Sequence, residues 1–235
     1  MCSLDEAQLL VKAGFTHLGF PMGPGVVEED VDAWKAARIV RALAADHTDD
    51  PVCVKITCVL ITYLRNALEI LELLERSAMR AVQLHAPVTP AEVAALRRAD
   101  PELVIFKSIV MGRPGEADPL NVARGHAPYV DAFLTDTYDP VTGASGATGR
   151  THDWAASRAL VEARLRPVIL AGGLTPDNVA QAVRAVRPAG VDAHTGLEDA
   201  QGRKDPEKAS SFVRNALQVL PNALEKGKQN PPFCW

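Results

Sequence analysis

The chain contains the stretch Val168-Ile169-Leu170-Ala171-Gly172-Gly173-Leu174-Thr175-Pro176-Asp177-Asn178-Val179, in which an apolar run ends in two glycines before a Thr-Pro-Asp-Asn helix start. This order predicts a buried strand that turns tightly into a helix whose first N–H groups are exposed, an arrangement that binds anions. Further on, a second short apolar segment ends in a small polar loop, Gly190-Val191-Asp192-Ala193-His194-Thr195-Gly196. Two adjacent strand-to-loop junctions of this kind predict a cradle for one phosphate group.

Length and composition fit one α/β domain. The chain has 235 residues, of which 47% are hydrophobic, and barrels of the (β/α)8 class comprise about 250 residues as a single unit. The formal net charge is −4 and no block of like charges occurs. We therefore expect no nucleic-acid partner.

The cysteines and the N-terminus indicate a soluble, cytoplasmic protein. The sequence has four cysteines and no C-x-x-C pair: Cys2, Cys53, Cys58 and Cys234. We expect the two in an apolar run, Cys53 and Cys58, to be buried thiols in a reducing, intracellular setting. Acidic residues at positions 5 and 6 interrupt the start before a signal-peptide core forms, and residues 52–64 are too few and too polar to span a bilayer. We expect no membrane partner.

Short apolar runs alternate with amphipathic helical patterns along nearly the whole chain. The predicted strands comprise residues 17–20, 52–63, 81–84, 103–108, 130–134, 167–171 and 190–193. The predicted helices lie near residues 4–13, 30–45, 65–77, 90–99, 118–125, 153–164, 176–187 and 206–220. Because the strands are apolar throughout, we expect parallel pairing with both faces covered. The β-then-α order favours a (β/α)8 TIM barrel over a doubly wound open sheet.

This pattern lacks the first strand of such a barrel. The first predicted helix begins almost at Met1, so the strand before it is truncated or missing, and either residues upstream of Met1 or another segment fills the gap. Residues 52–63 are more than one strand usually contains, so residues 58–62 are the better candidate for the barrel strand in this region. We expect a single barrel domain over residues 1–220 and a flexible C-terminal tail over residues 221–235.

Polar residues at predicted strand ends are the candidates for chemistry, because active sites of parallel barrels lie there. Asp136 follows one such strand and can act as a general acid with a raised pKa, or cap a backbone turn. His85 and His194 can contact a ligand, act as a base or be structural. The glycine-rich segment that contains Gly146 and Thr148 predicts a loop that closes over a ligand. Metal-ligand spacings do not occur in the sequence, so we expect no metal and no cofactor.

Several segments together resemble one known family. They are Leu134-Thr135-Asp136-Thr137, Gly146-Ala147-Thr148-Gly149 with Asp153-Trp154, Ile169-Leu170-Ala171-Gly172-Gly173-Leu174 with Asn178-Val179, Val191-Asp192 with Thr195-Gly196-Leu197-Glu198, and Gly202-Arg203-Lys204-Asp205. The family is phosphoribosylanthranilate isomerase, and the likeness extends over residues 4 to 218, with its most specific motifs in the second half.

The resemblance implies a metal-free (β/α)8 barrel that converts an aminoaldose phosphate to an aminoketose phosphate, an Amadori rearrangement of tryptophan biosynthesis. It places Asp136 where the family's general acid protonates the ribose ring oxygen. The residues that it places where backbone amides hold the substrate phosphate are Gly172, Gly173, Thr195 and Gly196. The expected partner is a small phosphorylated sugar or sugar amine, bound by a monomer or homodimer.

The chain departs from the family pattern at two functional positions. The family's general base is a cysteine at the end of the first strand, in a Lys-Ile-Cys-Gly type of motif, and here Cys2 falls after that position in the ungapped register. The family also has an Arg in the loop after the second strand, whereas residues 20–28 contain no Arg or Lys. That loss weakens binding of the anthranilate carboxylate. In addition, His194 replaces a small hydroxyl residue and His152 an apolar one.

Three functions are consistent with these features. The first is a phosphoribosylanthranilate isomerase-like enzyme with Asp136 as the acid and a base among Cys2, His85 and His194. The second is different sugar-phosphate chemistry on the same barrel, by an epimerase or a lyase. The third is a non-catalytic protein that binds a phosphorylated metabolite.

Overall fold

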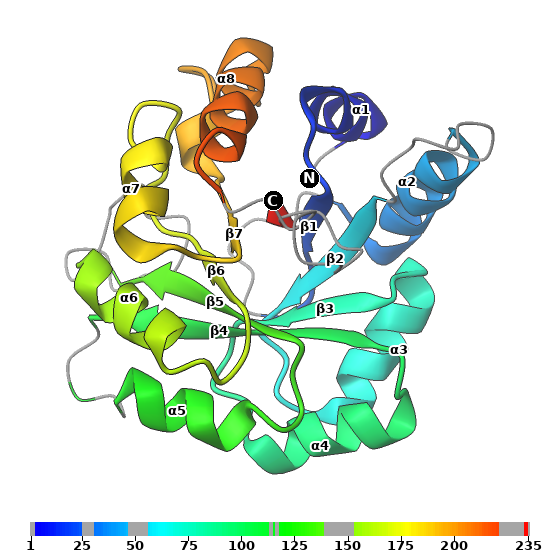
Figure 1. The fold of residues 1–235 in the computed structure, drawn as a ribbon. Coiled ribbons are helices and arrows are strands. Elements are labelled where there is room, and N and C mark those ends of the chain that lie inside the picture. The colour runs from blue at the N-terminus through cyan, green and yellow to red at the C-terminus, as the bar shows by residue number, and fades with distance from the viewer. Residues whose placement is uncertain are drawn as a thin grey trace. The chain divides into compact units, whose positions relative to one another are not determined.

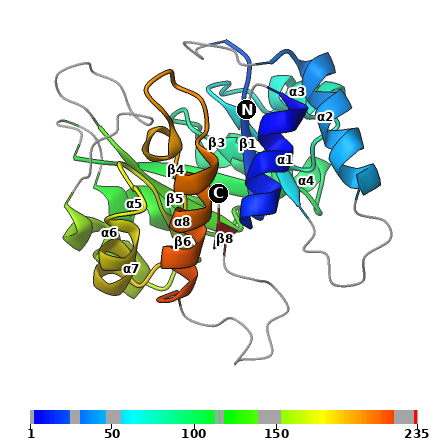
Figure 2. The same ribbon diagram turned by 90° about the horizontal axis from the view of Figure 1, so that it is seen from above.

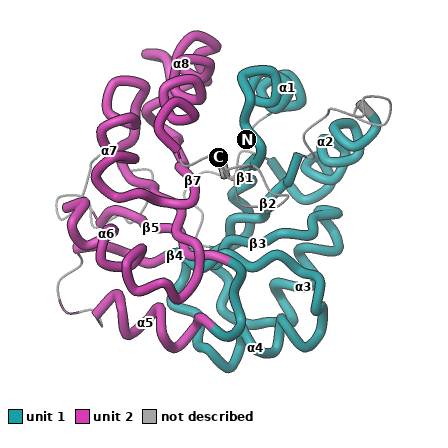
Figure 3. The backbone as a smooth tube through the Cα atoms, viewed as in Figure 1, with its two compact units in different colours: residues 1–108, 128–131 teal, residues 109–127, 132–235 magenta. Residues whose placement is uncertain are grey.

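The computed structural model describes residues 3–24, 31–46, 56–112, 115, 118–138, 153–220 and 233–234 (Figures 1 and 2). Helices and strands alternate along these residues. They belong to two compact units (Figure 3), of which unit 1 comprises residues 1–108 and 128–131, and unit 2 comprises residues 109–127 and 132–235. The expectation of one barrel domain over residues 1–220 stays a prediction.

Unit 1 contains the first half of the elements. Its helices are α1 (Leu4–Ala13), α2 (Ala33–Asp46), α3 (Ala67–Ser77) and α4 (Pro90–Ala99). Its strands are β1 (His17–Pro21), β2 (Thr57–Thr62), β3 (Ala81–Leu84) and β4 (Val104–Met111), and β4 continues into unit 2. These strands pair in parallel in chain order, with Leu18 opposite Cys58 and Leu84 opposite Lys107.

Unit 2 contains the second half. Its helices are α5 (Pro119–His126), α6 (Trp154–Glu162), α7 (Val179–Val186), the 3-10 helix η1 (Thr195–Leu197) and α8 (Pro206–Leu217). Its strands are β5 (Ala132–Thr137), β6 (Val168–Leu170), β7 (Gly190–Val191) and β8 (Phe233–Cys234). They also pair in parallel in chain order. Helices α6 and α7 pack side by side in both views (Figures 1 and 2).

Side-chain caps fix several helix starts where the sequence predicts them. Ser3 Oγ accepts the N–H of Glu6 at 3.1 Å at the start of α1. At the start of α8, the Asp205 carboxylate accepts the N–H groups of Glu207 and Lys208 at 2.8 and 3.0 Å. These bonds satisfy donors that the first turn of a helix leaves without a partner.

The strands form the buried layer of each unit. Every residue of β3 and of β5 is buried, as expected for parallel strands with both faces covered. The buried residues of α7 are Val179, Ala182, Val183 and Val186, which recur every three or four positions on one side of the helix. The predicted strands and helices are confirmed among the described residues, including the narrower prediction for the second strand, since β2 begins at Thr57.

One predicted helix start is wrong by three residues. The sequence places it at Pro176, whereas α7 begins at Val179. Asn178 Oδ1 accepts the N–H of Thr175 and its Nδ2 donates to the Gly173 carbonyl, both at 2.9 Å. These two bonds hold the segment after the glycines as a turn rather than as helix.

Strand β8 is an element that the sequence did not predict. Phe233 lies opposite Gly190 and Cys234 opposite Val191, so this segment extends the sheet of unit 2 beyond β7. The rest of residues 221–235 lies outside the described residues, and the flexible tail stays a prediction. Ser3, directly before α1, is the first described residue, so the described residues include no strand ahead of that helix.

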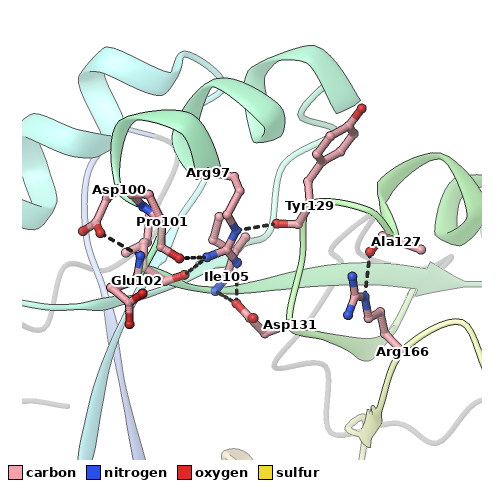
Figure 4. A network of polar contacts seen from close by, with 10 residues as sticks. Arg97, Asp100, Pro101, Glu102, Ile105, Ala127, Tyr129, Asp131 and Arg166 are labelled. Carbon is pink, nitrogen blue, oxygen red and sulfur yellow. Dashed lines mark hydrogen bonds and ion pairs between the residues drawn. The ribbon is translucent and has the colours of Figure 1, made fainter.

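Arg97 of α4 makes several polar contacts in unit 1 (Figure 4). Its guanidinium donates to the carbonyl oxygens of Leu103 at 2.7 Å and Tyr129 at 3.3 Å. Its Nη2 also lies 2.7 Å from Oδ2 of Asp131, which accepts the N–H of Ile105 at 2.7 Å. One side chain of α4 therefore satisfies backbone groups at the start of β4.

Candidate active site

Asp136 lies at the C-terminal end of β5 and is buried, with 5% of its surface exposed. Its Oδ1 accepts the N–H of Thr137 at 2.9 Å. The neighbouring Thr135 Oγ1 accepts the N–H of Ala171 at 3.1 Å, which ties the end of β5 to the end of β6. The carboxylate therefore stands on a rigid strand end, where parallel-barrel enzymes place their chemistry.

Asp192 is a second carboxylate in unit 2, directly after β7, and sequence reasoning missed it. Its N–H donates to the Leu170 carbonyl at 2.9 Å. Burial raises the pKa of Asp192 from 3.8 to about 7, with the nearby negative charge of Asp136 as the second cause. The Lys204 ammonium and the N–H of Ala193 act in the opposite direction. The available signal was a carboxylate within the last predicted apolar strand, residues 190–193.

The turns after β6 and β7 lie against each other. Gly172 and Gly173 have φ values of 102° and 62°, the left-handed region that favours glycine. A Cβ on Gly196 would overlap the carbonyl oxygen of Leu174 and lie 3.2 Å from the Cα of Thr175. The structure therefore brings these predicted phosphate-binding glycines, with Thr195 beside them, to neighbouring turns of one unit.

His194 precedes η1 and has an exposed side chain. Its Nδ1 lies 2.9 Å from the Nζ of Lys204, and its Nε2 lies 3.4 Å from Oε1 of Glu198. Lys204 Nζ lies 2.7 Å from the same Glu198 oxygen. The ring of His194 is thus part of a polar cluster with its Nδ1 engaged by an ammonium.

His85 follows β3 and belongs to unit 1. Its N–H donates to the Thr62 carbonyl at 3.0 Å, and its ring packs on Tyr63 with 4.5 Å between centroids. Buried Lys107 donates to the carbonyls of Leu84 and Ala86, on either side of His85, at 3.2 and 3.1 Å. The backbone around His85 is therefore held from both neighbouring strands.

Some predicted site residues lie outside the described residues: Cys2, Gly146, Thr148 and His152. Cys58 is partly buried, and burial raises its pKa to about 12, so its sulfur is a thiol. Among the residues that the structure describes, His, Cys, Asp and Glu side chains form no group of three or more that could hold a metal ion. Over the same residues, every helix is too short or too polar to cross a membrane.

Comparison with known proteins identifies relatives over most of the chain. A family model described as N-(5'phosphoribosyl)anthranilate (PRA) isomerase matches residues 31–215. The chain is 36% identical to N-(5'-phosphoribosyl)anthranilate isomerase 2 of Methanosarcina mazei, over 91% of this chain and 89% of that protein. It is 34% identical to the N-(5'-phosphoribosyl)anthranilate isomerase of Haloarcula marismortui, over 94% of each. The solved phosphoribosyl anthranilate isomerase of Thermus thermophilus matches with a TM-score of 0.73 and 26% identity, over 93% of this chain and 96% of that one.

These likenesses define the class of protein: the chain has the (β/α)8-barrel fold of an aldose–ketose isomerase. The strand that precedes the first helix of such a barrel does not occur among the described residues ahead of α1. The chain belongs to the N-(5'-phosphoribosyl)anthranilate isomerase family. Enzymes of this family catalyse the Amadori-type isomerisation of tryptophan biosynthesis. The predicted fold class and the predicted family are therefore confirmed.

Proposed function

We propose that this chain isomerises N-(5'-phosphoribosyl)anthranilate with Asp136 and Asp192 as a pair of acid–base carboxyl groups. The observation that supports the pair is the pKa of Asp192, which burial first, and then the negative charge of Asp136, raise to about 7. A carboxyl group with a pKa near neutral pH can release a proton and accept one there.

The reaction needs an acid and then a base, and the pair supplies both. One carboxyl group of the pair donates the proton to the ribose ring oxygen, the bond from C1 to that oxygen breaks, and the nitrogen lone pair forms an iminium ion. The ionised pair then accepts the proton from C2, and the resulting enol becomes the aminoketose. The pair begins and ends the cycle with one proton, so the step balances.

The choice of base follows from the other candidates. The Nδ1 atom of His194 lies 2.9 Å from the Lys204 ammonium, so its lone pair is engaged. We therefore assign the C2 proton to the carboxyl pair rather than to His194.

The phosphate group of the substrate is proposed to bind the turns after β6 and β7. Gly172 and Gly173 leave the backbone of the first turn open to a ligand, and Gly196 allows the second turn to approach the first. Small residues and successive N–H groups at strand ends suit a phosphate dianion. Thr195 adds a hydroxyl donor at the same turn.

Steady-state assays with phosphoribosylanthranilate test the carboxyl pair. We expect Asp136→Asn and Asp192→Asn each to lower kcat by about 10²–10⁴-fold, the usual contribution of a positioned acid or base. Asp177→Asn is the matched control, because Asp177 is an exposed carboxylate after the Gly172-Gly173 turn. Unchanged rates in Asp136→Asn would remove that residue from the mechanism.

A second candidate is a sugar phosphate without an aromatic carboxylate. Its support is the sequence after β1, where residues 21–32 contain four acidic residues and no Lys or Arg. Such a sequence offers no cation to pair with a ligand carboxylate. Thermal shift with a panel of sugar phosphates tests it, since a ligand raises Tm by mass action. A larger shift with phosphoribosylanthranilate than with every other compound would exclude this candidate.

We also propose a cytoplasmic enzyme that acts as a monomer or homodimer. The carboxyl pair and both turns belong to unit 2 of one chain, so the mechanism requires no residue from a second copy. Sedimentation equilibrium measures the assembly, and fractionation of cells that express the chain measures its location.

A further inference from the structure

The segment Gly202-Arg203-Lys204-Asp205 between η1 and α8 has no role in the mechanism above, yet its lysine is nearly buried. The side chain of Lys204 is only 7% exposed. Its Nζ lies 2.7 Å from Oε1 of Glu198, 2.9 Å from Nδ1 of His194 and 3.1 Å from the His194 carbonyl oxygen. The three donors of one ammonium group therefore have three acceptors on the segment from His194 to Glu198.

Those acceptors stand at the two ends of the turn that carries Thr195 and Gly196. The Glu198 N–H donates to the Thr195 carbonyl at 3.1 Å, which closes the turn from within. The Lys204 ammonium joins the first residue of the turn, His194, to the last, Glu198. An antiparallel bridge also pairs the backbone of Glu198 with that of Lys204. A nearly buried ammonium in such contacts holds the backbone more firmly than an exposed one, since water screens it less.

The same ammonium also acts on the carboxyl pair. Its positive charge lowers the pKa of Asp192, against the effects of burial and of Asp136. Asp192 and the turn are consecutive along the chain, with only Ala193 between Asp192 and His194. One side chain thus contacts the turn and, through its charge, affects Asp192.

We infer that Lys204 is a positioning residue for phosphate binding: it holds the turn from His194 to Glu198 in the shape that binds the phosphoryl group. This inference rests on the role proposed above for that turn. Lys204 acts through its neighbours and has no assigned contact with the substrate.

The test compares Lys204→Met, which removes the ammonium and keeps the length, with Lys204→Arg, which keeps the charge. Arg203→Met is the matched control, because Arg203 is the adjacent cation, is 75% exposed and pairs with Asp199. Calorimetry measures the Kd of inorganic phosphate, and assays across pH measure KM and kcat. Circular dichroism checks that each variant is folded.

We expect Lys204→Met to raise both the phosphate Kd and KM by about tenfold or more, the loss typical of charge-assisted hydrogen bonds. The pKa seen in the kcat profile should also rise, because a cation near Asp192 is gone. Lys204→Arg should raise the phosphate Kd and KM by less. In Arg203→Met both values should stay within about twofold of the wild type, because an exposed ion pair contributes little. A general loss of folding stability would not shift the pH profile.

Phosphate affinity and a pH profile unchanged in folded Lys204→Met would overturn the inference, as would an equal loss in Arg203→Met. If Lys204→Met does not fold, Glu198→Gln replaces it, because it removes the charged acceptor of the same ammonium. In that variant the ammonium and its charge remain, so phosphate affinity is the readout, and an unchanged Kd would overturn the inference. A wild-type chain that binds phosphate but does not isomerise phosphoribosylanthranilate contradicts the proposed function alone. A wild-type chain that isomerises it, with phosphate affinity indifferent to Lys204, contradicts this inference alone.

Discussion

Burial and, after it, the negative charge of Asp136 at the end of β5 raise the pKa of Asp192, which follows β7. The two carboxyl groups come from strands separated by β6 in the sheet of unit 2. Together with burial, this interaction brings the pKa of Asp192 to about 7. A carboxyl group in this state changes its charge in the physiological range, which suits proton transfer.

The pH dependence of stability follows from the sign of that shift. Because the pKa of Asp192 is raised above its ordinary 3.8, its contribution to stability is fully present below about pH 4 and is lost as pH rises through about 7. We expect Asp192→Asn to be more stable than the wild type at pH 8 by about 1–2 kcal/mol, and the difference to shrink at pH 5. Urea unfolding at both pH values measures it, with Asp177→Asn as control. A variant less stable than the wild type at pH 8 contradicts the prediction.

Gly196 is expected to tolerate no side chain. A Cβ there would overlap the Leu174 carbonyl oxygen, a backbone atom that cannot rotate away, so Gly196→Ala must separate the two turns. We predict an increase of the phosphate Kd by at least about tenfold and a loss of about 1–3 kcal/mol of stability. Gly202→Ala is the control, because no atom lies within 4 Å of its Cβ position, although its φ of +74° adds some strain. Phosphate affinity equal in the two variants would argue against contact between the turns.

Arg97 is expected to stabilise unit 1 through its contacts with Leu103, Tyr129 and Asp131 (Figure 4). Arg97→Met removes the donor of those carbonyls and the charge partner of Asp131, which keeps the N–H of Ile105, and we predict a loss of about 2 kcal/mol of unfolding free energy. Arg98→Met removes the next cation on the exposed side of α4 and should change stability by no more than about 0.5 kcal/mol. Chemical denaturation measures both. Equal effects would mean that helix charge, rather than the contacts, stabilises the unit.

Strand β8 is expected to stabilise the edge of β7 by backbone pairing. Proline cannot donate to a strand ladder, so the double variant Phe233→Pro with Cys234→Pro should lose about 1 kcal/mol and expose β7 to faster amide exchange. The double alanine variant at the same positions keeps both N–H groups and serves as control. Exchange in residues 186–198, followed by mass spectrometry, gives the readout. No difference between the two variants would mean that the pairing contributes nothing in solution.

The order of helices and strands could be predicted from the sequence because its causes are local. Ser3 and Asp205 stand directly before two predicted helices and cap them with their side chains. The buried residues of α7 recur with a helical period. The start of α7 could not be predicted in this way. It depends on the Asn178 side chain, which binds Thr175 and Gly173 instead of leaving them to the first turn of a helix.

The sequence by itself determined the alternation of β and α elements, the double-glycine turn and the family, because apolar periodicity, caps and glycines act over a few residues. Only the tertiary structure decided that Asp192 titrates near neutral pH, that Gly196 touches Leu174, that Lys204 holds His194 and Glu198, and that Phe233 pairs with Gly190. Each of these depends on a distance or a burial that arises when segments far apart in the chain come together. No local pattern encodes such proximity, and the charge state of a carboxyl group follows from it.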